Sequence, residues 1–305
     1  GRGIEITHVA AKELREPRHY SIEGIRVTQD PWQVVNDPDV EIVCELMGGL
    51  EPACELVLAA IANGKHVVTA NKYLIATRGN RIFEAAHAAG VTVAFEAAVA
   101  GGIPVIKAVR EGLAGNQIEW LAGIINGTCN YILTAMRDQG REFADVLAEA
   151  QTLGYAEADP SFDIDGIDAS HKLMILAAIA FGIPLQHDKV HVEGIRGITR
   201  EDVQYAAELG YRIKHLGIAR RTPAGIELRA HPTLVPQRRL IANVDGVMNA
   251  VLVRGDAVGP LLLYGAGAGA EPTASAVVAD LVDVVRALTT DPGNRVPHLA
   301  FQPDA

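Results

Sequence analysis

The stretch LGYAEADPSFDIDGIDASHK, residues 153–172, is the most informative segment of the chain. It contains five carboxylates, ends at Lys172, and is followed by ten residues, 173–182, that carry no charge. A run that is apolar on every side predicts a helix that is buried all round rather than along one stripe. We therefore expect a buried helix that is capped by Asp163 or Asp165 and that carries Lys172 in its first two turns.

Opposing influences act on the ammonium of Lys172 in this arrangement. Burial and the positive end of the helix dipole disfavour its charge, whereas the nearby carboxylates favour it. A lysine in such a setting can transfer a proton near neutral pH. The simpler interpretation is a loop of solvated acids followed by an ordinary i,i+4 ion pair between Asp168 and Lys172. The stretch alone does not decide between the two.

Length and composition indicate a globular protein with room for two domains. The chain has 305 residues, of which 49% are hydrophobic and 21% are charged. The formal charge of −10 argues against nucleic acid and anionic membrane surfaces as partners. No uncharged apolar run is long enough to span a bilayer and the first residues do not resemble a signal peptide, so we expect a cytoplasmic protein. Three cysteines without metal-ligand spacing predict reduced, mostly buried thiols: Cys44, Cys54 and Cys129.

The first hundred residues predict a Rossmann-like parallel sheet. Strands are expected at 4–10, 39–47, 65–70 and 91–95, with helices at 52–63 and 79–89. Strands that alternate with helices of this length indicate parallel pairing through right-handed crossovers. The G-x-G-x-x-G turn that normally opens such a domain is not found in its expected position, so we expect the first β-α unit to be missing.

Ligands in such sheets bind beyond the carboxyl ends of the strands. Gly48 and Gly49 follow the second predicted strand, and Lys72 follows the third. Glycines allow a flat ring or a phosphate to approach the backbone, although a glycine pair is also an ordinary tight turn. A cation directly after a buried strand is rarely needed for packing, so Lys72 is the stronger candidate for a cofactor contact.

The rest of the chain predicts an α+β domain in which helices cover a mixed or antiparallel sheet. Alternating hydrophobicity and turn residues indicate hairpins at 211–231 and 246–264. Helices are expected at 126–136 and 199–209, and a short one opens at Pro104.

A glycine-alanine run, residues 265–269, leads toward a predicted helix at 274–288. Such a loop can bind an anion at the helix N-terminus, or it can serve as a flexible crossover between domains. The last residues have several prolines and no periodicity, which is typical of a linker.

Five motifs occur in order along nearly the whole chain and together resemble homoserine dehydrogenase. They are ANK (70–72), EAAVAGGIP (96–104), IINGT (124–128), LGYAEADP (153–160) and GAGAG (265–269). The block from residue 153 to Lys172 is specific to that family, whereas the glycine runs are not. The resemblance implies reversible hydride transfer between NADP (or NAD) and the pair L-aspartate 4-semialdehyde and L-homoserine. That reaction belongs to threonine, methionine and isoleucine biosynthesis.

The resemblance also implies a domain plan within the α/β class. Residues 1–100 and 271–290 would form the nucleotide-binding domain, with its first β-α unit missing, and residues 101–270 the catalytic and dimerisation domain. Residues 291–305 would be a C-terminal linker or tail. The implied partners are a small-molecule substrate and further copies of the chain, as a homodimer or homotetramer, with the dimer formed through the second domain's sheet.

Catalytic and substrate-binding roles follow from the same motifs. By resemblance, Lys172 is the proton donor to the aldehyde oxygen, and Lys72 is a second lysine near the nicotinamide and the reacting oxygen. Glu157 and Asp168 would hold the substrate, with Asp163 in the same cluster. An amino-acid substrate has an ammonium that needs buried carboxylates, and its carbonyl needs a donor as negative charge develops.

Five acids exceed what one ammonium requires, so Asp159 and Asp165 are assigned to loop structure or capping. The resemblance implies cofactor contacts at Gly154 and Gly269, in addition to Gly48 and Gly49. It also implies a structural monovalent cation, sodium, held by Glu96, Val99, Gly101 and Ile103. The alternative for that segment is a plain Gly-Gly turn before Pro104.

Two other functions stay open at this point. The chain could be a non-catalytic fragment that folds and dimerises but binds the cofactor poorly, or a different NAD(P)-dependent dehydrogenase of a semialdehyde or amino acid. The lack of a nucleophilic-cysteine setting argues against acyl-enzyme chemistry. Lys12 and Arg15 could meet a 2′-phosphate and Glu13 a ribose hydroxyl, which leaves the choice of cofactor open and favours NADP slightly.

Overall fold

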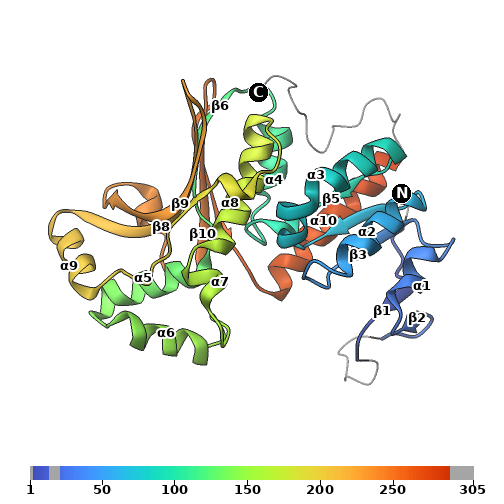
Figure 1. The fold of residues 1–305 in the computed structure, drawn as a ribbon, viewed down its shortest axis with the longest axis horizontal. Helices are drawn as coiled ribbons and strands as arrows, with labels where there is room; N and C mark the ends of the chain where they lie inside the picture. The colour runs from blue at the N-terminus through green and yellow to red at the C-terminus, as the bar shows by residue number, and fades with distance from the viewer. Residues whose placement is uncertain (1–2, 14–20, 289–305) are drawn as a thin grey trace. The chain divides into compact units, whose positions relative to one another are not determined.

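The computed structural model describes residues 3–13 and 21–288, and these form two compact units (Figure 1). The first unit comprises the described parts of residues 3–95 together with 277–288, and the second comprises residues 96–276. The predicted tail, 291–305, and Arg15 lie outside the described residues.

The core of the first unit is a parallel sheet, as predicted, but it has three strands. Its order is β3 (Ile42–Glu45), β4 (His66–Thr69) and β5 (Val93–Ala94). The crossovers are α2 (Ala53–Ala62) and α3 (Lys72–Ala89). Every residue of β4 is buried, as expected for the central strand of a parallel sheet.

The first predicted strand does not join this sheet. Only three residues of it, β1 (His8–Ala10), are extended, and they pair in parallel with β2 (Arg26–Thr28) in a separate two-stranded sheet. A helix that the sequence analysis missed, α1 (Pro31–Asn36), follows, with Asp30 as its N-cap. Three-residue strands are too short to show alternation, and a six-residue helix too short to show periodicity. The prediction of four strands in one sheet was therefore wrong.

Helix α3 begins at Lys72, seven residues before the predicted start. Asn71 is its N-cap, because the side-chain oxygen accepts a hydrogen bond of 3.0 Å from the Leu74 backbone N–H. The helix ends at Gly90, which is left-handed with φ 67°. The polar segment TRGN at 77–80 hides the helical period in the sequence. Lys72 is thus the first residue of a helix rather than part of a loop.

The second unit contains a six-stranded mixed sheet, in which both predicted hairpins are present. The strand order is β11-β10-β6-β8-β9-β7, and every pair is antiparallel except β7 with β9. The strands are β6 (Ile118–Ile124), β7 (His191–Val192), β8 (Tyr211–Thr222), β9 (Gly225–Pro236), β10 (Met248–Gly255) and β11 (Gly259–Ala266).

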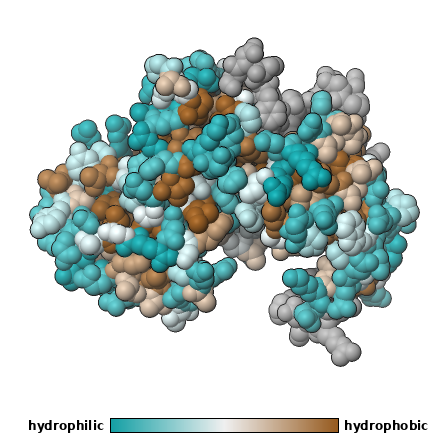
Figure 2. All heavy atoms as spheres, in the orientation of Figure 1, coloured by the Kyte–Doolittle hydropathy of each residue, from teal (hydrophilic) through white to brown (hydrophobic). Residues whose placement is uncertain are grey.

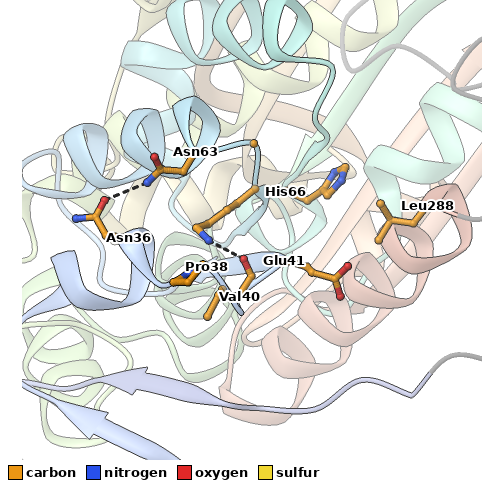
Figure 3. Close-up of a pocket in the computed structure, with 9 residues that line it drawn as sticks. Asn36, Pro38, Val40, Glu41, Asn63, His66 and Leu288 are labelled. Atoms are coloured by element: carbon orange, nitrogen blue, oxygen red, sulfur yellow. Dashed lines mark hydrogen bonds between the residues drawn. The ribbon is translucent and has the colours of Figure 1, made fainter.

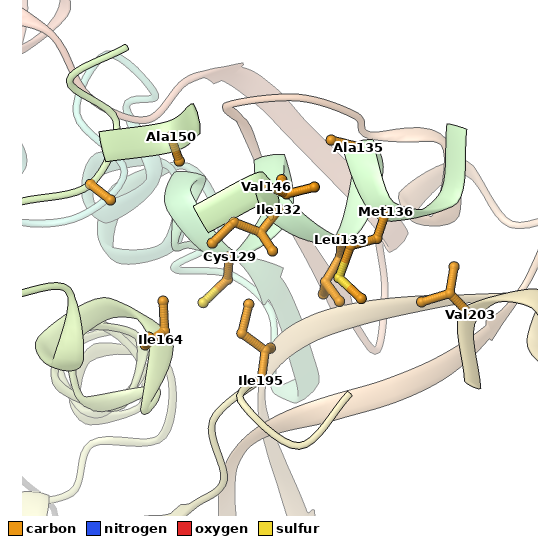
Figure 4. Packing of buried hydrophobic residues seen from close by; sticks show 11 residues of the cluster. Cys129, Ile132, Leu133, Ala135, Met136, Val146, Ala150, Ile164, Ile195 and Val203 are labelled. Carbon is orange, nitrogen blue, oxygen red and sulfur yellow. The ribbon is translucent and has the colours of Figure 1, made fainter. Parts of the chain in front are cut away.

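The helices from residue 96 onward lie in both units, and some of them were not predicted. The longer ones are α5 (Gly127–Gln139), α6 (Phe143–Thr152), α8 (Ile167–Phe181), α9 (Arg200–Glu208) and α10 (Ala270–Leu288). The shorter ones are η1 (Glu96–Ala98), α4 (Val105–Lys107), η2 (Ala108–Gly112), α7 (Ser161–Ile164), η3 (His187–Lys189) and η4 (Leu240–Asn243). Helix α6 was missed, although it contributes Val146 and Ala150 to the apolar cluster that α5 and α9 share (Figure 4).

Helix α8 is the buried helix that the sequence predicts, but neither Asp163 nor Asp165 caps it. Its N-cap is Gly166, which is left-handed with φ 82° and has no capping side chain. The left-handed backbone favours glycine, and a Cβ at Gly166 would also lie only 3.0 Å from Nε2 of His215, which is a tight contact. The capping prediction was therefore wrong, and the two aspartates have other partners.

The surface of the molecule agrees with its charged composition. On the face drawn in Figure 2, hydrophilic residues cover most of the area and apolar residues form separate patches. Within the described residues, none of the helices is both long and apolar enough to cross a membrane. Cys54 and Cys129 are buried and Cys44 is exposed, and all three are free thiols.

A buried ionic cluster joins β8 to α5 in the second unit. Lys214 is 1% exposed, and its ammonium donates to the Val244 carbonyl at 2.6 Å, to Oδ1 of Asn130 at 3.1 Å and to Oδ1 of Asp245 at 2.9 Å. Arg137 also donates to Asp245 Oδ1, at 2.9 Å. Burial opposes the charge of Asp245, but the hydrogen bonds from Arg137 and Lys214 outweigh it and lower the pKa of Asp245 to about 2.

We expect Asp245→Asn to lower the free energy of unfolding at pH 7 by about 1–2 kcal/mol, a figure reduced for the partial exposure of the carboxylate. Because the folded pKa lies below the unfolded value of 3.8, this stabilisation is present above pH 4 and is lost as the pH falls toward 2. Denaturant titrations of parent and variant at pH 7, 4 and 3 measure the difference. A gap that stays constant down to pH 3 would contradict this account.

Candidate active site

Lys172 lies in the second turn of α8 and is held by two acceptors. Its ammonium donates to Oδ2 of Asp168 at 2.8 Å and to the carbonyl of Ile125, just beyond β6, also at 2.8 Å. The side chain of Lys172 is 11% exposed and that of Asp168 is 1% exposed. The i,i+4 ion pair of the simpler interpretation therefore exists, but it is buried instead of solvated.

Asn126 links this ion pair to a second carboxylate. Its amide nitrogen donates to Oδ2 of Asp168 at 2.9 Å and to Oδ1 of Asp163 at 2.7 Å. Its side-chain oxygen accepts from the backbone N–H of Cys129 at 2.8 Å and thereby caps α5. One buried amide thus fixes the end of β6, the start of α5 and two carboxylates relative to one another.

Thr128 ties the segment around Gly154 to this cluster. Its hydroxyl lies 2.6 Å from the carbonyl of Tyr155 and 3.3 Å from Oδ2 of Asp163. Gly154 is exposed and left-handed, with φ 75°. Glu157 is also exposed, and the contact found for it is between its backbone carbonyl and Gln151 Nε2, at 3.1 Å. The structure therefore groups Asp163, Asp168 and Lys172, and it places Glu157 outside that group.

The two remaining acids of the stretch serve local structure. Oδ1 of Asp159 accepts from the backbone N–H of Ser161 at 3.1 Å, and hydrogen bonds from the Ser161 side chain and backbone lower the pKa of Asp159. Asp165 forms an ion pair with Arg196, in which Nη2 lies 3.2 Å from Oδ2. Both observations agree with the assignment of these acids to the loop, although neither residue caps α8.

The segment 96–103 packs closely against the glycine-alanine run. The carboxylate of Glu96 accepts from the backbone N–H groups of Ile106 and Lys107, each at 2.8 Å, and so it closes the first turn of α4. Gly101 is left-handed with φ 46°, and a Cβ there would lie 2.6 Å from the carbonyl oxygen of Gly267. Within the described residues, no group of three or more His, Cys, Asp or Glu side chains is placed to hold a metal ion.

The glycine-alanine run is shorter than predicted. Gly265 and Ala266 belong to β11, and α10 begins at Ala270, four residues before the predicted start. Gly269 directly precedes the helix, with φ 117°, a conformation that side chains rarely adopt. The segment between strand and helix is therefore three residues long, and its geometry depends on glycine.

In the first unit, the predicted cofactor residues lie at the carboxyl ends of β3 and β4. Gly48 and Gly49 are both left-handed with φ 73°, and the carbonyl of Gly49 accepts from the Asn71 side chain at 2.7 Å. Lys72 follows Asn71 as the first residue of α3 and is partly buried. A surface pocket lined by Lys65, His66 and Leu288 lies at the opposite, amino ends of these strands (Figure 3).

Two polar side chains of the cluster, Asn126 and Thr128, were not predicted as site residues. The sequence placed them only at the start of a helix. The sequence did contain one signal, because Asn126 follows a strand and directly precedes a helix. A capping side chain at such a position can also reach a neighbouring polar group. The backbone carbonyls of Ile125 and Tyr155 carry no such signal, because any residue can supply them.

Family models match the chain over most of its length. The model for the homoserine dehydrogenase NAD binding domain matches residues 2–96, and the homoserine dehydrogenase model matches residues 104–282. The homoserine dehydrogenase of Pseudomonas aeruginosa is 68% identical over 306 residues, covering 100% of this chain and 70% of that protein. The homoserine dehydrogenase of Neisseria gonorrhoeae is 58% identical over 302 residues, covering 99% and 69%.

Solved structures agree with these matches. The crystal structure of a homoserine dehydrogenase from Thiobacillus denitrificans has a TM-score of 0.92 and 69% sequence identity, covering 98% of this chain and 69% of that one. A hyperthermophilic archaeal homoserine dehydrogenase in complex with NADPH has a TM-score of 0.74 and 28% identity, covering 85% and 76%. With both of its units matched by family models and relatives this similar, the chain belongs to the homoserine dehydrogenase family.

Proposed function

We propose that this chain reduces L-aspartate 4-semialdehyde to L-homoserine, and catalyses the reverse reaction, with NADP as the preferred cofactor. Its family consists of NAD(P)-dependent oxidoreductases, and one relative of known structure holds NADPH. The observation that carries the proposal is the buried cluster of Lys172, Asp168, Asn126 and Asp163. That cluster offers carboxylates for an amino group and an ammonium for a carbonyl oxygen within one unit.

Lys172 supplies the proton in the reduction. Bound NADPH supplies the hydride, which leaves the aldehyde oxygen with developing negative charge. The ammonium of Lys172 stabilises that charge and then transfers a proton to the oxygen. Asp168 and the Ile125 carbonyl each hold the ammonium at 2.8 Å, so its orientation is set before the substrate arrives.

Asp168 and Asp163 bind the ammonium group of the substrate. Both carboxylates accept a hydrogen bond from the amide of Asn126. The cluster thus contains two carboxylates and one ammonium, that of Lys172. A second cation is therefore accommodated there at low electrostatic cost. Glu157 enters the proposal through its family motif, since its carboxylate lies outside the cluster.

The proposed cofactor contacts are made by one lysine and four glycines: Lys72, Gly48, Gly49, Gly154 and Gly269. Lys72 occupies the first position of α3, where the positive end of the helix dipole disfavours a cation. Its position is therefore unfavourable for helix stability, and an anionic group of the cofactor bound there would offset that cost. The left-handed glycines leave the backbone open to a phosphate or a ring.

A monovalent cation, sodium, is proposed at Glu96, Val99, Gly101 and Ile103. The carboxylate of Glu96 already accepts two backbone N–H groups, so carbonyl oxygens of the loop would supply the ligands. Among the described residues, no backbone N–H donates to the carbonyls of Val99 or Gly101. Bare carbonyl oxygens are the hard ligands that such an ion takes.

A homodimer is proposed through the second unit's sheet. Leu262, Leu252, Ala122 and Ile218 are cross-strand neighbours in one row over β11, β10, β6 and β8. All four are partly exposed. An apolar row across four strands is the kind of surface that a second copy buries in an isologous interface.

The decisive assay is oxidation of NADPH in the presence of aspartate semialdehyde, with parent protein and Lys172→Met. We expect the variant to lose about 10²–10⁴-fold in kcat, the range for removal of a general acid. NADPH binding, measured by fluorescence titration, should stay close to the parent value. Lys189→Met, which removes an exposed lysine, serves as the control. A variant with parental kcat would refute the assignment of Lys172, and a parent without turnover would refute the proposed reaction.

For the dimer, we expect Leu252→Arg to shift the mass in solution toward the 32.4 kDa of one chain, because an arginine in the apolar row cannot be desolvated cheaply. Size-exclusion chromatography with light scattering gives the mass. Leu209→Arg, at an exposed position after α9, should leave the oligomer intact. If both variants have the parental mass, the copies do not meet on this face.

A further inference from the structure

Glu45 is a buried carboxylate that the proposed reaction does not use. It is the last residue of β3 and is 4% exposed. A buried acid is costly unless its oxygens are hydrogen-bonded. Its position at the carboxyl end of a parallel strand, next to Gly48 and Gly49, raises the question of what its oxygens hold.

Both oxygens of Glu45 accept hydrogen bonds from the strand ends. Oε1 accepts from the backbone N–H of Met47 at 2.9 Å and of Gly48 at 3.2 Å. Oε2 accepts from the hydroxyl of Thr69 at 2.7 Å. Thr69 is the last residue of β4 and the direct cross-strand neighbour of Glu45. One carboxylate therefore binds the turn after β3 and the end of β4.

The contacts continue into α3 and return to the same turn. The Thr69 hydroxyl accepts from the backbone N–H of Asn71 at 3.0 Å. The Asn71 side chain donates to the carbonyl of Gly49 at 2.7 Å and accepts from the N–H of Leu74 at 3.0 Å. The path from Glu45 through the glycine turn, Asn71 and Thr69 back to Glu45 is closed.

We propose that Glu45 is a positioning residue for the cofactor: it fixes the Gly48–Gly49 turn and the start of α3, and therefore Lys72, in one arrangement. This inference rests on the proposed function, in which those three residues bind NADPH. A carboxylate suits the task because charge-assisted hydrogen bonds to backbone N–H groups are strong in a buried site. Glu45 itself touches neither substrate nor cofactor in this proposal.

The turn requires an acceptor for the N–H groups of Met47 and Gly48, and Glu45→Gln keeps that acceptor while it removes the negative charge. In Glu45→Gln, the amide oxygen can still accept from Met47 and Gly48, and the amide nitrogen can donate to the Thr69 hydroxyl, which has a second lone pair for it. In Glu45→Ala, those three donors lose their acceptor. Glutamine is therefore the conservative variant, and alanine is the disruptive one.

Lys65 offers a matched control at the other end of the same two strands. It is 5% exposed, and its ammonium donates to the carbonyls of Asp37 at 2.5 Å and Val40 at 2.7 Å. Like Glu45, it is a buried charged group that ties loops of the first unit together. Unlike Glu45, it lies at the amino ends of the strands, away from the proposed cofactor residues.

The experiment compares parent, Glu45→Ala, Glu45→Gln and Lys65→Met. Thermal midpoints report folding, fluorescence titration gives Kd for NADPH, and initial rates give kcat and the KM of each substrate. We expect Glu45→Ala to raise Kd and KM for NADPH about 10-fold and to leave KM for the semialdehyde within about twofold. Glu45→Gln should restore Kd to within about threefold of the parent value. Lys65→Met should lower the thermal midpoint without a change in Kd.

Two results would overturn the inference. One is Glu45→Ala with a lowered midpoint and unchanged Kd and KM for NADPH, which is the behaviour expected of Lys65→Met. The other is Glu45→Gln as impaired in NADPH binding as Glu45→Ala, because the charge would then matter instead of the acceptor geometry. A parent that binds NADPH without turnover would count against the proposed reaction alone, since the variants' Kd values do not depend on catalysis.

Discussion

The buried ion pair between Lys172 and Asp168 is the interaction on which the proposed chemistry of the second unit depends. Bringing both charges out of water is costly, and a buried pair persists only where further hydrogen bonds complete it. The Ile125 carbonyl and the Asn126 amide provide them, at 2.8 and 2.9 Å. Helix α8 places the two side chains one turn apart, and the two residues that follow β6 supply the groups that complete them. Removal of either charge would leave the other buried and uncompensated.

The first unit uses the same principle with one charge instead of two. Within the part of the chain that the structure describes, the hydrogen bonds that Glu45 accepts come from two backbone N–H groups and one hydroxyl, and none comes from an ammonium. Those donors belong to segments that must keep their shape if a cofactor is to bind at the strand ends. In both units, therefore, a buried carboxylate organises backbone that the sequence leaves conformationally free, such as the glycine turn at 48–49. In each unit the carboxylate fixes the backbone conformation, and the proposed ligand contacts depend on that conformation.

Much of the fold could be predicted because its signals are local. The hairpins β8–β9 and β10–β11 show alternation over long strands, α8 is apolar over its central part, and α5 begins at a capping asparagine. The failures have equally specific causes. Helix α3 begins earlier than predicted because a polar segment hides its period, and the pairing of β1 with β2 depends on contacts between three-residue strands. Where tertiary packing supplies the stability, local pattern is a poor guide to boundaries.

The candidate site shows the same division between local and non-local information. The sequence identified the acid-rich stretch and Lys172, but it could not say which of five carboxylates would be buried. That outcome depends on Gly166, whose left-handed conformation turns the chain so that Asp168 enters the core while Asp165 meets Arg196 outside it. Glu45 was equally hidden, because its meaning comes from the register that pairs it with Thr69. An acid at the end of a strand cannot be told from an ordinary polar residue until its cross-strand neighbour is known. Residues that position a site are therefore harder to find from sequence than residues that act in it.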